Sequence, residues 1–281
     1  MSSQLDPLPE YVEPSSVPVL NQSAAAPPTE TPSAPLTKPF PAWSGWDVLA
    51  VFGFSIATVF LFMVVAIIVA YLVRGGGSPM SDVKPYIPVA IGAQAASYPV
   101  ILLFIFFLVR SRSHAPFGKS ISWNWPRLSA PLFVIGGVLL AFAVDKLARY
   151  LPMPKSLPMD EYFTNPTNAY LMAGLGVLLA PLLEEVVFRG LLYPVLRRWA
   201  GVVVAVLLTA LAFASIHFSQ LGYAWGPALS IFIVGVVFTL VRERTNSLAA
   251  SFLLHWGYNL TLFGAIWIAS DHFRHLERLA G

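Results

Sequence analysis

Apolar side chains fill long, nearly uninterrupted stretches of this chain, and polar residues are concentrated in the segments between them. A helix needs roughly 20 apolar residues to cross the hydrocarbon core of a bilayer. The pattern therefore predicts a series of spanning helices. Their approximate ranges are Trp46–Val73, Ile87–Val109, Ser129–Leu147, Ala169–Phe188, Gly201–Phe218, Ala224–Val241 and Leu248–Ala269.

One shorter apolar stretch, Leu191–Trp199, does not reach the length of a span. We expect it to form a re-entrant or interfacial turn, with an additional helix as the alternative. The predicted fold class is thus an all-α, polytopic membrane helical bundle of about seven to eight transmembrane helices. Trp43 and Trp46 suit the interfacial belt at the start of the first span.

The first 41 residues differ from the rest, because they hold ten of the 24 prolines and no apolar run. Such a segment cannot bury enough apolar surface to offset its ordering entropy. We therefore predict a disordered, Pro-rich tail over 1–41 and a membrane domain over 46–270.

Composition supports the membrane assignment. Hydrophobic residues make up 57% of the chain and charged residues 11%, whereas soluble domains carry about 25% charged residues. A soluble enzyme or a nucleic-acid-binding protein is therefore excluded, and the net charge of +3 does not change this. Cysteine is absent, so thiolate catalysis is excluded as well.

The distribution of basic residues predicts the orientation in the membrane. With the N-terminus inside, the inside loops hold ten of the 17 Lys and Arg residues. We expect a multi-pass protein of a bacterial inner or plasma membrane, with its N-terminus in the cytoplasm.

Few ionisable side chains lie well inside the apolar runs, where they are costly and usually functional. They are the carboxylates Glu184 and Glu185 and the imidazoles His217 and His255. These four side chains come from three predicted helices and are the main candidates for chemistry.

The spacing separates the two acids. Glu185 and Arg189 are four residues apart, which favours an ion pair on one helical face. Glu184 points about 100° away and has no partner in its own helix, which suits a general base. A purely structural role, in which the cluster holds helices together, is the alternative.

The histidines also have neighbours at helical spacing. Phe213 and His217 share one face, and His255 and Asn259 share another. The second pair offers two hydrogen-bond donors, as an oxyanion site requires, although it could simply link helices. Gly257, which lies between them, would admit a neighbouring helix or a substrate.

Three motifs occur in order on successive apolar segments: Glu-Glu-x-x-x-Arg at 184–189, Phe-x-x-x-His at 213–217 and His-x-x-x-Asn at 255–259. Together they resemble the CAAX-protease and bacteriocin-processing (CPBP, or Abi) family of intramembrane glutamic endopeptidases, over roughly residues 130–270.

The resemblance implies that Glu184 and His217 activate a water while His255 and Asn259 hold the oxyanion. It also implies that Glu185 and Arg189 shape the site, with Phe213 in support. The expected partners are the lipid bilayer and a peptide or lipidated-protein substrate, which would be cleaved near its C-terminus. No cofactor is expected.

Three alternatives remain open at this stage. Two histidines and a glutamate from separate helices could instead bind zinc, although the His-Glu-x-x-His spacing is absent. A relay of Glu184, His217 and His255 would suit a proton-coupled transporter, but the two halves of the chain show no internal repeat. A non-catalytic scaffold or immunity protein with the same fold would tolerate loss of Glu184.

Overall fold

The computed structural model describes residues 40–73, 87–127 and 129–279, and these contain no β-strand. The predicted disordered tail over 1–41 lies almost entirely outside the described residues. The helices are α1 (Gly45–Val73), α2 (Ile87–Arg112), α3 (Phe117–Ser120), α4 (Ala130–Ala148), α5 (Pro166–Gly174), α6 (Ala180–Glu185), α7 (Tyr193–His217), α8 (Trp225–Thr245) and α9 (Leu248–Ala269). The predicted all-α membrane fold is confirmed.

Six helical runs in the described part of the chain are long and apolar enough to cross a bilayer. One of them, Pro166–His217, joins α5, α6 and α7 and contains both the fourth and the fifth predicted spans. The six runs therefore account for every predicted span, and the chain is a multi-pass membrane protein.

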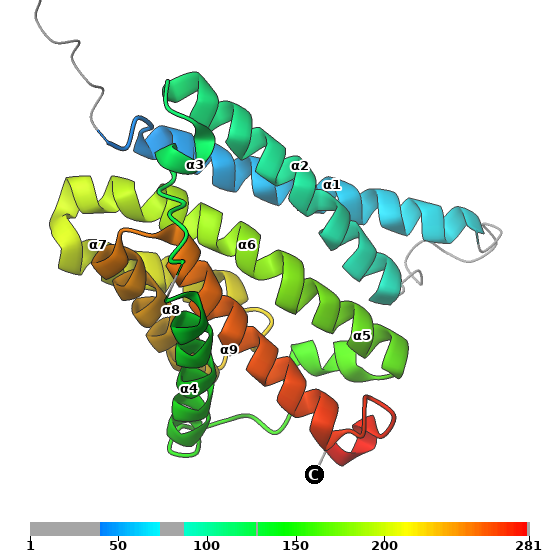
Figure 1. Ribbon diagram of the computed structural model, residues 1–281. Helices are drawn as coiled ribbons and strands as arrows, with labels where there is room; N and C mark the ends of the chain where they lie inside the picture. The colour runs from blue at the N-terminus through cyan, green and yellow to red at the C-terminus, as the bar shows by residue number, and fades with distance from the viewer. Residues whose placement is uncertain (1–39, 74–86, 128, 280–281) are drawn as a thin grey trace, which may run out of the picture. The chain divides into compact units, whose positions relative to one another are not determined.

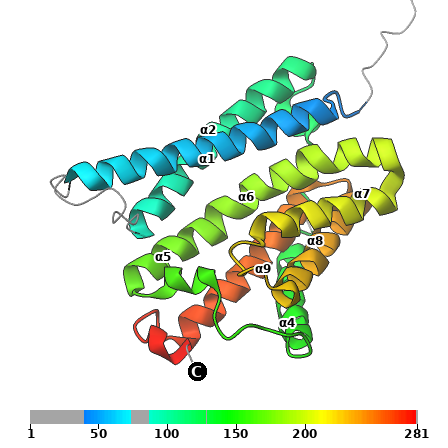
Figure 2. The ribbon, with the colours of Figure 1, turned by 180° about the vertical axis from the view of Figure 1, so that it is seen from behind.

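The long run is divided at Gly201, whose φ of 77° and ψ of 176° are not helical. Figures 1 and 2 show the chain turning back at this point, within the element labelled α7. Only glycine adopts this backbone region readily, because any other residue would place Cβ in a clash with its own backbone. Gly201 thus separates the two predicted spans.

The prediction of a re-entrant or interfacial turn at Leu191–Trp199 is wrong, because this segment continues the helix. Two π-helical stretches, Leu175–Leu179 and Val186–Leu192, occur on either side of α6. Each is followed within two residues by a proline, Pro181 or Pro194. Proline has no N–H for the regular helical pattern, and the wider π turns let the chain continue past it.

The first part of this run lies between two groups of helices (Figures 1 and 2). The antiparallel pair α1 and α2 covers one side, and α9 covers the other. The side chains of α6 consequently face neighbours on both sides, which places Glu184 and Glu185 at the centre of the bundle.

Helices α4 and α9 cross at glycines. A Cβ added at Gly257 would collide with the backbone of Val134, and one added at Gly137 would collide with the backbone of Leu254. Small residues at such crossings let membrane helices approach closely. Gly257 therefore serves the packing of α9 against α4.

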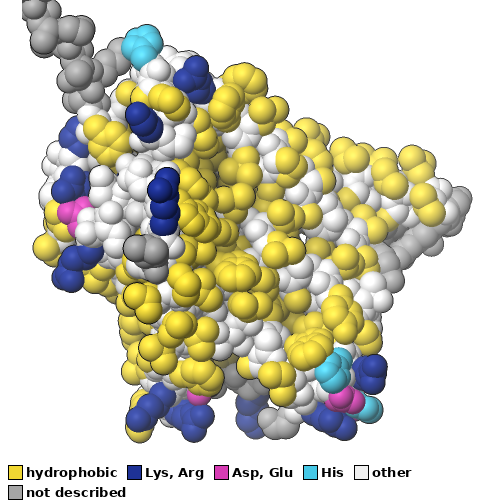
Figure 3. Space-filling view, viewed as in Figure 1, with side chains coloured by type: hydrophobic (Ala, Val, Ile, Leu, Met, Phe, Trp, Pro, Cys, Tyr) yellow, Lys and Arg dark blue, Asp and Glu magenta, His cyan; other side chains and the backbone are white. Residues whose placement is uncertain are grey.

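Apolar atoms cover the middle of the face shown in Figure 3, while Lys and Arg side chains gather at two opposite ends. One end holds the turn of α7, and the other holds the C-terminal ends of α4 and α9. An apolar band between two charged ends is the surface that a bilayer-spanning protein requires.

The turn at Gly201 yields a stability prediction. Gly201→Ala should lower the free energy of unfolding by about 1–3 kcal/mol, because alanine is strained in this backbone conformation. No neighbouring atom would meet the added Cβ, so the loss reports on the backbone alone. Thermal unfolding of the purified protein in detergent measures it.

Gly264→Ala is the matched control, since this glycine lies inside α9 and an added Cβ there also meets no atom. Alanine is favoured over glycine in a helix, so the control should be neutral or slightly stabilising. Equal stability of the Gly201→Ala protein and the wild type would contradict the role of this turn.

Candidate active site

Glu185 and Arg189 form the predicted ion pair, and both side chains are fully buried. Arg189 Nη1 donates to Glu185 Oε1 at 3.0 Å. The same guanidinium donates to the carbonyl of Gly235 at 3.0 Å and to Oγ1 of Thr239 at 3.2 Å. The pair therefore connects its own helix to α8.

The Glu185 carboxylate also contacts α9. Ser251 Oγ donates to Glu185 Oε2 at 2.6 Å, and His255 Nδ1 lies 3.1 Å from Glu185 Oε1. Arg189, Ser251 and His255 together occupy both carboxylate oxygens. The hydrogen-bonding capacity of Glu185 is therefore largely used within the protein.

Glu184 has a different environment. Its side chain is 16% exposed, and its Oε2 lies 3.6 Å from His255 Nε2. His255 thus stands between the two carboxylates, with one ring nitrogen toward each. Glu184 also lines a cavity of about 570 Å³, a volume suited to a small ligand or a peptide segment.

His217 lines the same cavity as Glu184. Its Nδ1 is buried and has no hydrogen-bond partner among the described residues. A buried polar nitrogen without a partner is costly in a finished core. The ring therefore has unused hydrogen-bonding capacity at Nδ1.

Helices α1 and α2, for which the sequence suggested no role, form much of the cavity wall. Phe52, Ile56 and Val59 make the α1 side apolar. On α2, Gln94 Nε2 donates to Tyr98 Oη at 2.8 Å, and both side chains line the cavity. Two polar residues four apart in an apolar span are the signal that could have identified this pair.

Phe213 packs at the centre of the candidate residues. Its ring centroid lies 4.9 Å from that of His217 and 5.9 Å from that of His255. The Arg189 guanidinium carbon lies 4.5 Å from the same ring centroid, a cation–π distance. The phenyl ring therefore holds both imidazoles and the buried cation in place.

Asn259 is directed elsewhere. Its Nδ2 donates to the carbonyl of Gly176 at 2.8 Å, in the π-helical stretch before α6. The nitrogens of His255 face the two carboxylates, so the donors of His255 and Asn259 point to separate acceptors. The structure brings Glu184, Glu185, Arg189, Phe213, His217 and His255 together and places Asn259 one helical turn beyond them.

No group of three or more His, Cys, Asp or Glu side chains in the described ranges is arranged to hold a metal ion. Whether peptide cleavage depends on zinc is tested directly with a chelator.

The family comparison covers this site. Residues 166–261 match the family described as type II CAAX prenyl endopeptidase Rce1-like. The predicted resemblance is confirmed. All seven candidate residues lie within the matched segment, and the match indicates a CAAX-type intramembrane protease. No curated protein and no solved structure is significantly similar to the chain.

The buried ion pair of Glu185 and Arg189 yields a stability prediction. Arg189→Met should lower the free energy of unfolding by about 3–5 kcal/mol, because it leaves the Glu185 charge buried without its cation. Thermal or denaturant unfolding in detergent measures the change.

Arg149→Met is the matched control. Arg149 pairs with Asp145 at the same spacing and the same 3.0 Å distance, but the two side chains are 75% and 63% exposed. Loss of an exposed pair costs less than about 1 kcal/mol. Similar losses in the two variants would show that burial does not decide the contribution of the pair.

Proposed function

We propose that this protein is an intramembrane endopeptidase that hydrolyses a peptide bond with a water molecule activated by Glu184 and His217. One observation carries the proposal: these two side chains, from α6 and α7, line a single cavity in an apolar bundle. A carboxylate and an imidazole that face a common space can position and deprotonate a water.

Glu184 is the general base in this proposal. Glu185, its neighbour, already accepts hydrogen bonds from Arg189 and Ser251 and contacts His255, whereas Glu184 faces the cavity. The water oxygen attacks the carbonyl carbon of the substrate, and its proton passes to Glu184. Breakage of the C–N bond then releases the amine, which takes up that proton through Glu184 or His217.

His255 and Asn259 supply the oxyanion donors in this proposal. His255 Nε2 already lies beside Glu184, at 3.6 Å from Oε2. Asn259 would release the Gly176 carbonyl and rotate toward the substrate, so its donor becomes available when a peptide is bound. Catalytic hydrogen bonds commonly tighten only in the substrate complex.

The cavity also supports a class of substrate. Ile56 and Phe60, at its α1 wall, are 71% and 69% exposed. In a bilayer these side chains face lipid, so an apolar substrate can reach Glu184 from within the membrane. A prenylated peptide, like those named in the family description, or another membrane-embedded segment fits this route.

The test is cleavage of two fluorogenic peptides, one farnesylated and one plain and apolar, by the purified protein in detergent. Glu184→Gln and His217→Ala should each reduce the rate by at least about 100-fold, as loss of general acid–base catalysis does. Each variant is assayed with and without a zinc chelator, and its unfolding temperature is measured.

Glu161→Gln, which removes an exposed carboxylate outside the cavity, is the control and should cleave at the wild-type rate. Cleavage at the wild-type rate by a folded Glu184→Gln protein would exclude Glu184 as the general base and overturn this mechanism. Loss of wild-type activity with the chelator would replace the metal-independent mechanism by a metal-dependent one.

A further inference from the structure

A second cavity, of about 430 Å³, lies at the turn of α7 and away from the candidate active site. Its lining includes Tyr193, Arg197, Arg198, Val202, Arg242 and Glu243. None of these residues lines the cavity of Glu184 and His217. The proposed peptidase reaction assigns no role to this site.

Three arginines and one acid face this cavity. The acid, Glu243, is already bound, because Arg197 Nη2 lies 3.0 Å from its Oε1 and Tyr193 Oη donates to its Oε2 at 2.6 Å. Arg198 Nη1 donates to the carbonyl of Pro41 at 3.1 Å, which neutralises no charge. The hydrogen bonds of Glu243 thus go to Tyr193 and Arg197, and this carboxylate acts on Arg242 only through the attraction between their charges.

Arg242 carries the strongest signal. The residue is 3% exposed, yet its Nε has no hydrogen-bond partner among the described residues. Within the described part of the chain, its side chain donates from Nη1 to Asn246 Oδ1 at 3.0 Å, at the end of its own helix. A buried guanidinium with an unused donor is costly unless an anion binds it.

Basic residues in the last turn of a helix also offset its dipole, and Arg242 and Arg244 both lie in the last turn of α8. Arg244 is exposed and does not line the cavity, and an exposed position is sufficient for offsetting the helix dipole. The burial of Arg242 in a cavity wall is left unexplained by the dipole.

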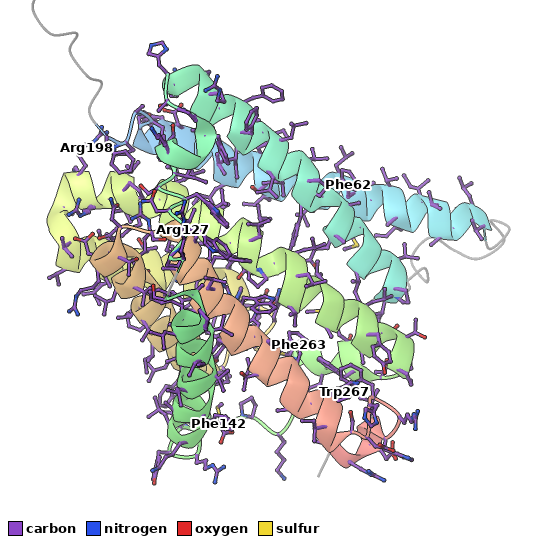
Figure 4. The ribbon with its side chains drawn as sticks, viewed as in Figure 1. Phe62, Arg127, Phe142, Arg198, Phe263 and Trp267 are labelled. Atoms are coloured by element: carbon purple, nitrogen blue, oxygen red, sulfur yellow. The ribbon has the colours of Figure 1, made fainter. Side chains whose placement is uncertain are left out.

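The surroundings indicate the kind of anion. Trp199 and Val203, on either side of the Gly201 turn, are 79% and 72% exposed, and Val202 lines the cavity itself. Arg198 is labelled in Figure 4 at this same end of the bundle, which is one of the two charged ends seen in Figure 3. A charged cavity beside exposed apolar side chains fits an anionic group that is joined to an apolar chain.

We propose that the cavity lined by Arg198 and Arg242 binds the phosphate group of an anionic membrane lipid. Guanidinium groups bind phosphate oxygens through several directed N–H donors. The lipid phosphate would accept hydrogen bonds from the guanidinium groups of Arg198 and Arg242, while the acyl chains lie along Val202 and Val203. Basic pockets at the membrane surface recognise anionic headgroups in this manner.

The experiment measures binding of a fluorescent phosphatidylglycerol to the full-length protein in detergent, with labelled phosphatidylcholine as the comparison. The wild type should prefer phosphatidylglycerol, because the choline cation is repelled by the arginines. Arg242→Gln should weaken phosphatidylglycerol binding by about tenfold or more, as loss of a charged hydrogen bond does.

Arg244→Gln is the matched control from the same helical turn and should change the affinity by less than about fivefold. Arg198→Gln repeats the test from another helix, and it decides the outcome if Arg242→Gln does not fold. Inorganic phosphate is then added as a competitor. Competition at millimolar concentration shows that phosphate alone suffices, and its absence shows that the lipid is required.

Either result of the competition experiment supports a phosphate site. The two results distinguish a site that accepts free phosphate from one that requires the whole lipid. Equal affinity for the two lipids, or equal affinity of the wild type and the folded Arg242→Gln and Arg198→Gln proteins, would overturn the proposal. The readout is binding and not cleavage, so the result is independent of the proposed peptidase activity.

Discussion

A fully buried carboxylate, Glu185, is the constraint on which the centre of this protein depends. A charge in an apolar interior costs several kcal/mol unless other groups compensate it. Here the compensating groups are Arg189 on the same helix and Ser251 and His255 on α9. Because Arg189 also bonds to the carbonyl of Gly235 on α8, one carboxylate ties three helices together.

The same network determines the position of the neighbouring acid. Adjacent helical residues point about 100° apart, so Glu184 lines the cavity while Glu185 is enclosed by its hydrogen-bond partners. His255 contacts Glu185 through Nδ1, and this contact directs Nε2 toward Glu184. A structural ion pair and a carboxylate open to a cavity can therefore occupy consecutive positions. The structural and the catalytic interpretations of the two acids are compatible for this reason.

The long helical run that carries the acids also connects the two cavities. Glu184 and Val187 line one of them, and Tyr193 and Arg197 line the other. The π-helical stretch Val186–Leu192 contains Val187 and ends directly before Tyr193. A π turn changes the rotational register of the residues that follow it, so the two sets face different neighbours. The first cavity has α1 and α2 in its wall, and the second has α8.

The spans could be predicted closely from the sequence because their cause is local. Each must satisfy its backbone hydrogen bonds within itself and expose apolar side chains to lipid. The ends of α1, α4 and α9 accordingly lie within one residue of their predicted positions. The ion pair of Glu185 and Arg189 was predictable for the same reason, since the regular helix places residues four apart on one face.

Contacts between helices could not be predicted in this way. Leu191–Trp199 was misassigned because Arg189 resembles the end of a span, whereas its charge is in fact paired inside the bundle. The bond of Ser251 to Glu185 and that of Asn259 to Gly176 depend on how α9 packs against the long run. Apolar periodicity tells which segments enter the membrane. Which side chains meet there is decided only by tertiary packing, because helices joined by loops can cross at many registers and buried charges select among them.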